Sequence, residues 1–126
     1  MEEPLARTYR LLSTDPDLIN RVGDRVFVED YPVEESNPNF RPTFPYIIVS
    51  EVVNVPVKRL RGGRGPGNSI QDINVYSEDY QEKIDIRDSV IGLLSQLGHV
   101  NEIDPSREPE LSAYRDRIEM SFWPPR

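Results

Sequence analysis

The sequence contains no cysteine and only one histidine among its 126 residues. The absence of cysteine excludes disulfide bonds, thiolate metal sites and a cysteine nucleophile. The single histidine, His99, has no nucleophile and no orienting acid near it in the sequence, so nothing local marks a catalytic dyad or triad. A structural or exposed histidine is the simpler interpretation. We therefore expect no enzyme, with neither catalytic nor cofactor-binding residues.

Long apolar runs are also missing. No stretch approaches the roughly 20 apolar residues that span a bilayer. The first residues, 1–4, are acidic and lack the basic-then-apolar layout of a signal peptide. We therefore expect synthesis in the cytoplasm and no membrane partner. Hydrophobic residues make up 37% of the chain and charged residues 29%, which predicts a lean core within one domain spanning residues 1–126.

Carboxylates stand close together at two places, but neither pattern predicts a metal site. Asp15 and Asp17 flank Pro16, where capping of a helix explains them. Asp85 and Asp88 lie at helical spacing on a polar face, where solvated charge is the usual finding. Neither pair has a third oxygen-rich ligand at a recognisable spacing.

A glycine-rich segment, residues 62–69 (GGRGPGNS), resembles a phosphate-binding P-loop only in the spacing of its glycines. Asn68 stands where the lysine of a P-loop must reach the phosphates, and a strand rather than a helix follows. We therefore expect no nucleotide cofactor.

Positive charge is concentrated in one segment of an acidic chain. The formal net charge is −7, which argues against general nucleic-acid binding. Residues 56–68, which we call the basic loop, carry four positive charges and no negative one, from Lys58, Arg59, Arg61 and Arg64; the rest of the chain therefore stands at −11. This distribution is typical of a protein that docks on its own copies or on another acidic protein. A loop that is simply solvated is the alternative.

Three segments have the pattern of longer strands. Residues 46–55 are β-branched on both faces, and residues 69–76 alternate, so the two form antiparallel arms of a hairpin around the basic loop. Residues 114–123 show the clearest alternation. Tyr114, Ile118, Met120 and Phe122 fall on one face, and Arg115, Arg117, Glu119 and Ser121 fall on the other.

Helical signals occur at three places. Residues 4–12 have helical apolar spacing, and Asp15 with Pro16 predicts an N-cap and first turn for a second short helix. A long helix begins after Ser77 or Asp79 and ends at Gly98, over about 19 residues. Its apolar stripe consists of Ile86, Val90, Leu93, Leu94 and Leu97, with Tyr80, Ile84 and Ile91 beside it.

The segments between these elements read as irregular. Residues 29–45 form a proline-rich excursion in which a regular element is not expected and Tyr31, Phe40 and Phe44 serve as anchors. An interaction arm is the functional alternative. Short strands are expected at residues 25–28 and 100–103, and residues 104–109 read as a turn-rich link. The whole order predicts an α+β fold, with an antiparallel sheet of about four strands packed against one long helix and short N-terminal helices.

This layout resembles the tail completion, or tail terminator, proteins of long-tailed bacteriophages and of related gene transfer particles. The resemblance rests on residues 15–19 (DPDLI), residues 22–27 (VGDRVF) and residues 44–50 (FPYIIVS), followed by a strand that ends in NVYS, a helix and a terminal strand. It covers nearly the whole chain. The long proline-rich excursion and the basic loop depart from the pattern.

The resemblance implies a virion structural protein without catalysis. Subunits of such proteins form a ring, commonly a hexamer, at the head-proximal end of the tail tube. The ring stops tube polymerisation and joins the tail to the head connector, so the implied partners are other copies of the chain, the tail tube protein and the connector proteins. Genomic DNA passes through the centre without sequence-specific binding. The implied location is the virion tail or neck.

A ring needs head-to-tail contacts between two different patches of each subunit. We expect Lys58, Arg59, Arg61 and Arg64 to contact a neighbouring subunit or the end of the tube, and strand pairing at an open sheet edge is a second route to assembly. Phe40, Phe44 and Trp123 are candidate contact anchors. A lid over the core is an equal alternative for Trp123.

Two rival functions use the same features. A head-closure or neck adaptor ring would have the same charge layout. A nucleic-acid-binding module would use the arginine-glycine segment of the basic loop, although no aromatic residue is interleaved with its arginines.

Overall fold

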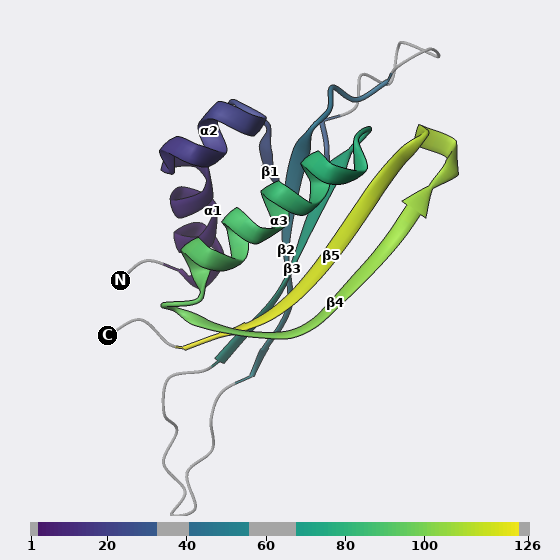
Figure 1. Cartoon of the computed structure of the whole chain (residues 1–126). Coiled ribbons are helices and arrows are strands. Elements are labelled where there is room, and N and C mark those ends of the chain that lie inside the picture. The colour runs from purple at the N-terminus through teal and green to yellow at the C-terminus, as the bar shows by residue number, and fades with distance from the viewer. Residues whose placement is uncertain (1–2, 33–40, 56–67, 124–126) are drawn as a thin grey trace, which may run out of the picture.

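A computed structural model of the chain describes residues 3–32, 41–55 and 68–123 (Figure 1). Within these ranges the fold is α+β, as the sequence predicts, with three α-helices, a short 3₁₀ helix and five strands. The elements are α1 (Pro4–Thr14), α2 (Pro16–Val22), β1 (Val26–Val28), β2 (Tyr46–Val55), β3 (Asn68–Ser77), α3 (Tyr80–Leu94), β4 (Gly98–Glu108), η1 (Pro109–Leu111) and β5 (Ala113–Phe122).

The five strands form one mixed sheet in the order β1-β2-β3-β5-β4. Strand β1 runs parallel to β2, whereas the other three pairs are antiparallel. The expected antiparallel sheet of about four strands is therefore wrong in strand number and in one direction. Residues 29–45 separate β1 from β2, which is enough chain for the crossover that parallel neighbours require.

Strand β4 is the largest departure from the sequence-based expectation. It is eleven residues long, and all of them except Asn101 pair with β5, where we expected a strand of four residues and a turn-rich link. Pro105, which favoured a turn, pairs with Asp116 in the outermost of the described strands. An edge strand tolerates proline because one side of its backbone has no strand to bond.

The long helix is shorter than expected, and Gly98 has a different role. Helix α3 ends at Leu94, after 15 residues. Gly98 begins β4 opposite Phe122, where a Cβ atom would overlap the backbone oxygen of Ser121. A close approach of two strands, rather than the end of a helix, therefore requires glycine at this position.

Both predicted helix caps are confirmed. The side chain of Asp15 accepts a hydrogen bond from the Leu18 backbone at 3.1 Å, and Pro16 occupies the first helical position of α2. The side chain of Asp79 accepts one from the Gln81 backbone at 3.2 Å at the start of α3. Each bond satisfies a backbone donor that the first helical turn leaves without a partner.

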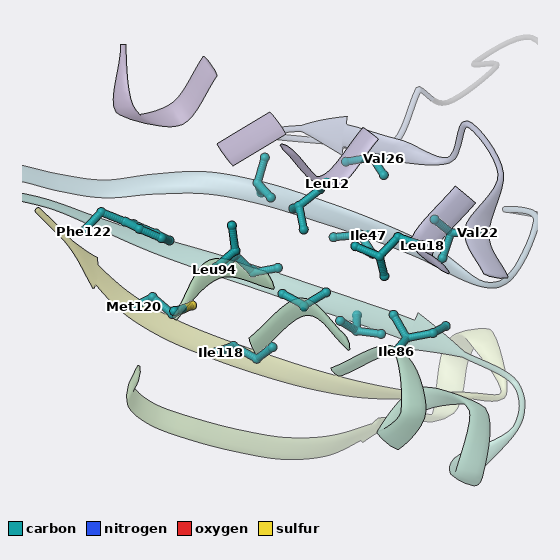
Figure 2. Packing of buried hydrophobic residues seen from close by; sticks show 14 residues of the cluster. Leu12, Leu18, Val22, Val26, Ile47, Ile86, Leu94, Ile118, Met120 and Phe122 are labelled. Carbon is teal, nitrogen blue, oxygen red and sulfur yellow. The ribbon is translucent and has the colours of Figure 1, made fainter. Parts of the chain in front are cut away.

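The hydrophobic core lies between the helices and one face of the sheet. Figure 2 shows Leu12 of α1, Leu18 of α2 and Ile86 of α3 meeting strand residues such as Ile47 and Ile118. The predicted stripe of α3 is buried at Ile86, Val90 and Leu94, with Leu93, Leu97 and Ile91 partly buried beside it, whereas Tyr80 is exposed. All three helices thus share a single core, and the long helix does not cover the sheet alone (Figure 1).

Candidate interaction surface

The opposite face of the sheet, which we call the open face, has none of the described helices packed on it (Figure 1). Strand alternation sorts the side chains between the two faces. On β5, Ile118 and Met120 are buried against the helices, so Arg117 and Glu119 project from the open face. Side chains such as Arg117 and Glu119, which are partly exposed on this face, are thus available for contacts with other molecules.

One half of the open face carries a cluster of five aromatic rings. Tyr46 of β2 is its centre, stacked on Tyr76 of β3 with ring centroids 4.6 Å apart. Tyr31 and Phe44 lie 4.8 and 5.3 Å from Tyr46, and Phe27 of β1 lies 4.7 Å from Tyr31. Tyr31 and Phe44, two anchors expected in the proline-rich excursion, therefore hold both ends of that segment against the sheet. The cluster adds ring-ring contacts to the area it buries.

Burial raises the pKa of the Tyr46 hydroxyl above its ordinary value, with smaller contributions from the neighbouring Tyr76, Tyr31 and Glu108. The residue is 3% exposed, so an ionised phenolate would lose most of its hydration. Tyr46 therefore stays neutral as the central packing element of the cluster.

The other half of the open face is acidic around one arginine. Arg117 Nη1 lies 3.0 Å from Asp72 Oδ1 on β3, and Arg117 Nη2 lies 3.4 Å from Glu102 Oε2 on β4. Asp104 and Glu119 each lie 3.9 Å from the same guanidinium. Burial lowers the pKa of Arg117, but the hydrogen bond that Arg117 donates to Asp72 and the charges of the surrounding acids outweigh this effect, so the pKa is raised.

A second arginine, Arg115, forms an ion pair at the other end of this acidic half. Arg115 Nε lies 3.2 Å from Glu108 Oε1 and donates a hydrogen bond to Ser106 Oγ at 3.1 Å. Only two guanidiniums thus face five carboxylates on β3, β4 and β5. The carboxylates are those of Asp72, Glu102, Asp104, Glu108 and Glu119. This half of the open face therefore keeps an excess of negative charge.

Three of these carboxylates belong to the outermost strand of the described sheet. We call Glu102, Asp104 and Glu108 of β4 the acidic edge. The side chains of Glu102 and Asp104 are 56% and 52% exposed, and that of Glu108 is 32% exposed. Each is more exposed than Asp72 and Glu119, whose side chains are 21% and 27% exposed.

A buried charge pair was missed by the sequence analysis. Lys83 Nζ of α3 lies 2.9 Å from Asp116 Oδ1 of β5, with side chains 2% and 0% exposed. Arg87 Nη1 lies 3.4 Å from Asp116 Oδ2, and the ring of Tyr80 lies 4.5 Å from Lys83 Nζ. The sequence did contain a sign of this pair. Asp116 interrupts the apolar row of β5, and Lys83 lies one helical turn before Ile86, which puts it on the same face of α3.

The predicted site residues are only partly placed. Lys58, Arg59, Arg61 and Arg64 lie outside the described residues, as does Phe40. Phe44 is half-buried in the aromatic cluster, with the Arg41 guanidinium 5.8 Å from its ring centroid.

Trp123 lies at the end of β5 and is 52% exposed. Its backbone nitrogen donates to the Leu97 carbonyl at 2.9 Å, and Arg7 donates to its carbonyl at 3.1 Å. Because Phe122 pairs with Ser69, Trp123 is at the end of the sheet where β3 begins. The basic loop joins the sheet at the same end.

Two other features are absent from the part of the chain that the structure describes. No group of three or more histidine or acidic side chains is arranged to hold a metal ion there. No helix within residues 3–32, 41–55 and 68–123 is long and apolar enough to cross a membrane.

No protein-family model and no curated protein sequence matches the chain. The fold does match a solved structure, a chain in the "Virion of native gene transfer agent (GTA) particle". The TM-score is 0.68 at 14% identity, and the match covers 96% of this chain and 97% of the other. At this identity the two chains share their fold over nearly their whole length.

Proposed function

We propose that this protein is a structural component of a phage-like virion, and that it forms a ring at the head-proximal end of the tail tube. The ring terminates tube polymerisation and joins the tail to the head connector. The observation that carries the proposal is the fold shared with a chain of a gene transfer agent virion over 96% of the residues. The motifs of residues 22–27 and 44–50, which resemble tail terminator proteins, point to the same role.

The shape of the subunit supports assembly into a ring. A closed head-to-tail ring requires two different contact patches on each subunit. One side of the sheet ends in β1 and the other in β4, and the acidic edge lies only on the β4 side. The partners proposed are other copies of this chain, as a hexamer, together with the tail tube protein and the connector proteins.

The charges favour protein contacts for the basic loop over contacts with the DNA that passes through the ring. Six copies of a loop with four positive charges would place about two dozen charges around the duplex, and neutralisation of phosphates is strongly favourable at low salt. Such a ring would hold the genome in place. We therefore assign the loop to a neighbouring subunit or to the end of the tube.

Capping of tail tubes tests the proposal directly. The purified protein is added to growing tubes of its own tail tube protein, and tube length and tube ends are measured by negative-stain microscopy. We expect shorter tubes with a ring on one end, and a ring mass for the isolated protein by native mass spectrometry.

Binding to the portal-side connector without an effect on tubes would instead assign the protein to the neck adaptor ring. This alternative has a specific basis, because the shared fold belongs to a chain of a whole virion and both kinds of ring are virion parts. A protein that neither forms rings nor binds either partner would contradict both assignments.

A further inference from the structure

We propose that the acidic edge of one subunit is the docking surface for the basic loop of the adjacent subunit in the ring. This inference rests on the proposed function, because it assigns the two patches that a head-to-tail contact requires. It names a second copy of the chain as the occupant of an exposed strand that no described residue covers.

The first argument is charge complementarity. The five carboxylates around Arg115 and Arg117 exceed the two guanidiniums by three negative charges. The basic loop supplies four positive charges and no negative one. Opposite charges at this density steer subunits together and set the orientation of their contact.

The second argument is the order of the strands that carry the two patches, since the basic loop leads from β2 into β3, the middle strand, and the acidic edge is on β4 at one side of the sheet. The basic loop begins after β2, whereas the acidic edge lies on β4, and β3 and β5 separate these strands. Three strand spacings amount to about 14 Å. A ring in which the β1–β2 side of one subunit faces the β4 side of the next would bring the Val55 end of β2 toward β4 of its neighbour.

The third argument concerns the kind of contact that the exposed edge of β4 can make with another subunit. Pro105 removes one backbone donor from the middle of the strand, and a register irregularity lies between Val100 and Glu102. Both features oppose the addition of another strand at this edge. A contact made by side chains, with arginines reaching carboxylates, is compatible with both.

Two double reversals test the contact. One chain carries Arg61→Glu with Arg64→Glu, and the other carries Glu102→Lys with Asp104→Lys. The first reversal takes the basic loop from +4 to 0 and sets two glutamates against Glu102 and Asp104, and the second sets two lysines against the cations of the loop. We therefore expect roughly a tenfold or greater loss of ring affinity in 50 mM salt from either reversal. The wild-type ring should also weaken between 50 and 500 mM salt, because exposed charges are screened.

Mixing the two reversed chains provides the decisive measurement. A junction between one chain of each kind has opposite charges again, so an alternating ring should reappear by native mass spectrometry. The matched control carries Asp85→Lys with Asp88→Lys, which makes the same charge change on exposed acids of α3, and it should assemble as the wild type does.

The absence of cysteine allows a second readout that does not depend on the reversed chains folding. A Gly63→Cys chain mixed with an Asn101→Cys chain should form a disulfide-linked heterodimer under mild oxidation, because Asn101 adjoins Glu102 on exposed β4. A Ser95→Cys chain, with its cysteine on the exposed end of α3, is the control and should not cross-link.

Three outcomes would overturn the inference while leaving the proposed function standing. The single reversals could assemble like the wild type, the cross-link could form equally with the Ser95→Cys control, or rescue could require all four substitutions in one chain, which would place the contact within a subunit. A wild-type protein that forms no ring would instead refute the proposed function itself.

Discussion

The buried pair of Lys83 and Asp116 is the residue-level feature with the largest expected effect on stability. Removing one partner of a buried ion pair leaves an uncompensated charge, at a typical cost of 3–5 kcal/mol. We predict that Lys83→Met lowers the free energy of unfolding by about 3 kcal/mol, because Arg87 near Asp116 offsets part of the loss. Urea unfolding followed by circular dichroism measures this change.

An exposed ion pair serves as the control for Lys83. Arg21 and Asp85 lie 3.9 Å apart with side chains 42% and 43% exposed, so Arg21→Met should cost less than about 1 kcal/mol. Equal effects of the two substitutions would mean that burial of the Lys83 pair has no energetic consequence. A chain with Lys83→Met and Asp116→Leu together should recover much of the lost stability.

The raised pKa of Tyr46 predicts how stability changes in alkaline solution. A group whose pKa is higher in the folded state binds its proton more tightly there, so its contribution is complete below the unfolded pKa. The contribution is then lost as the pH rises above the ordinary tyrosine value of 10.0. We expect the free energy of unfolding to fall as the pH rises above 10, and Tyr46→Phe to reduce that fall. An unchanged slope in the variant would show that Tyr46 titrates normally.

At the level of elements, two glycines with opposite surroundings test the packing of β4 on β5. A Cβ atom at Gly98 would meet the backbone of Ser121 and lie 2.9 Å from the Phe122 Cα, whereas a Cβ at Gly92 in α3 would meet no heavy atom within 4 Å. We predict that Gly98→Ala destabilises the protein by about 2 kcal/mol, since backbone must shift to accommodate it. Gly92→Ala should stabilise it by about 0.5–1 kcal/mol.

Thermal unfolding of the two alanine variants measures the contrast. Opposite shifts of Tm are expected, with Gly98→Ala below the wild type and Gly92→Ala above it. If both variants melted like the wild type, the close approach of β4 to β5 at this point would be wrong.

At the level of the whole molecule, the two faces of the sheet differ in what packs against them. Helices α1, α2 and α3 share the core on one face, and the aromatic cluster and the acidic half lie on the other. Strand β4 continues the sheet to its acidic edge, on the opposite side from β1. A subunit with two unlike sides can join copies of itself in one direction around a ring.

Local sequence patterns determined the elements whose boundaries depend on nearby residues. The caps at Asp15 and Asp79, the alternation of β5 and the buried stripe of α3 were predictable because each involves residues within a few positions of one another. The same patterns predicted the α+β class. Phe40 and residues 56–67 of the basic loop lie outside the described residues, so their roles stay predictions.

Tertiary structure alone decided the features that depend on partners distant in sequence. The parallel pairing of β1, the full length of β4 and the closeness of Gly98 to β5 arise from hydrogen bonds across the sheet, which local propensity does not encode. The same holds for the acidic half of the open face, since Asp72, Glu102 and Arg117 come from three different strands. The composition showed that the chain outside the basic loop is acidic. Only the order of the strands, which puts β4 at the side of the sheet, placed part of that negative charge on the exposed acidic edge.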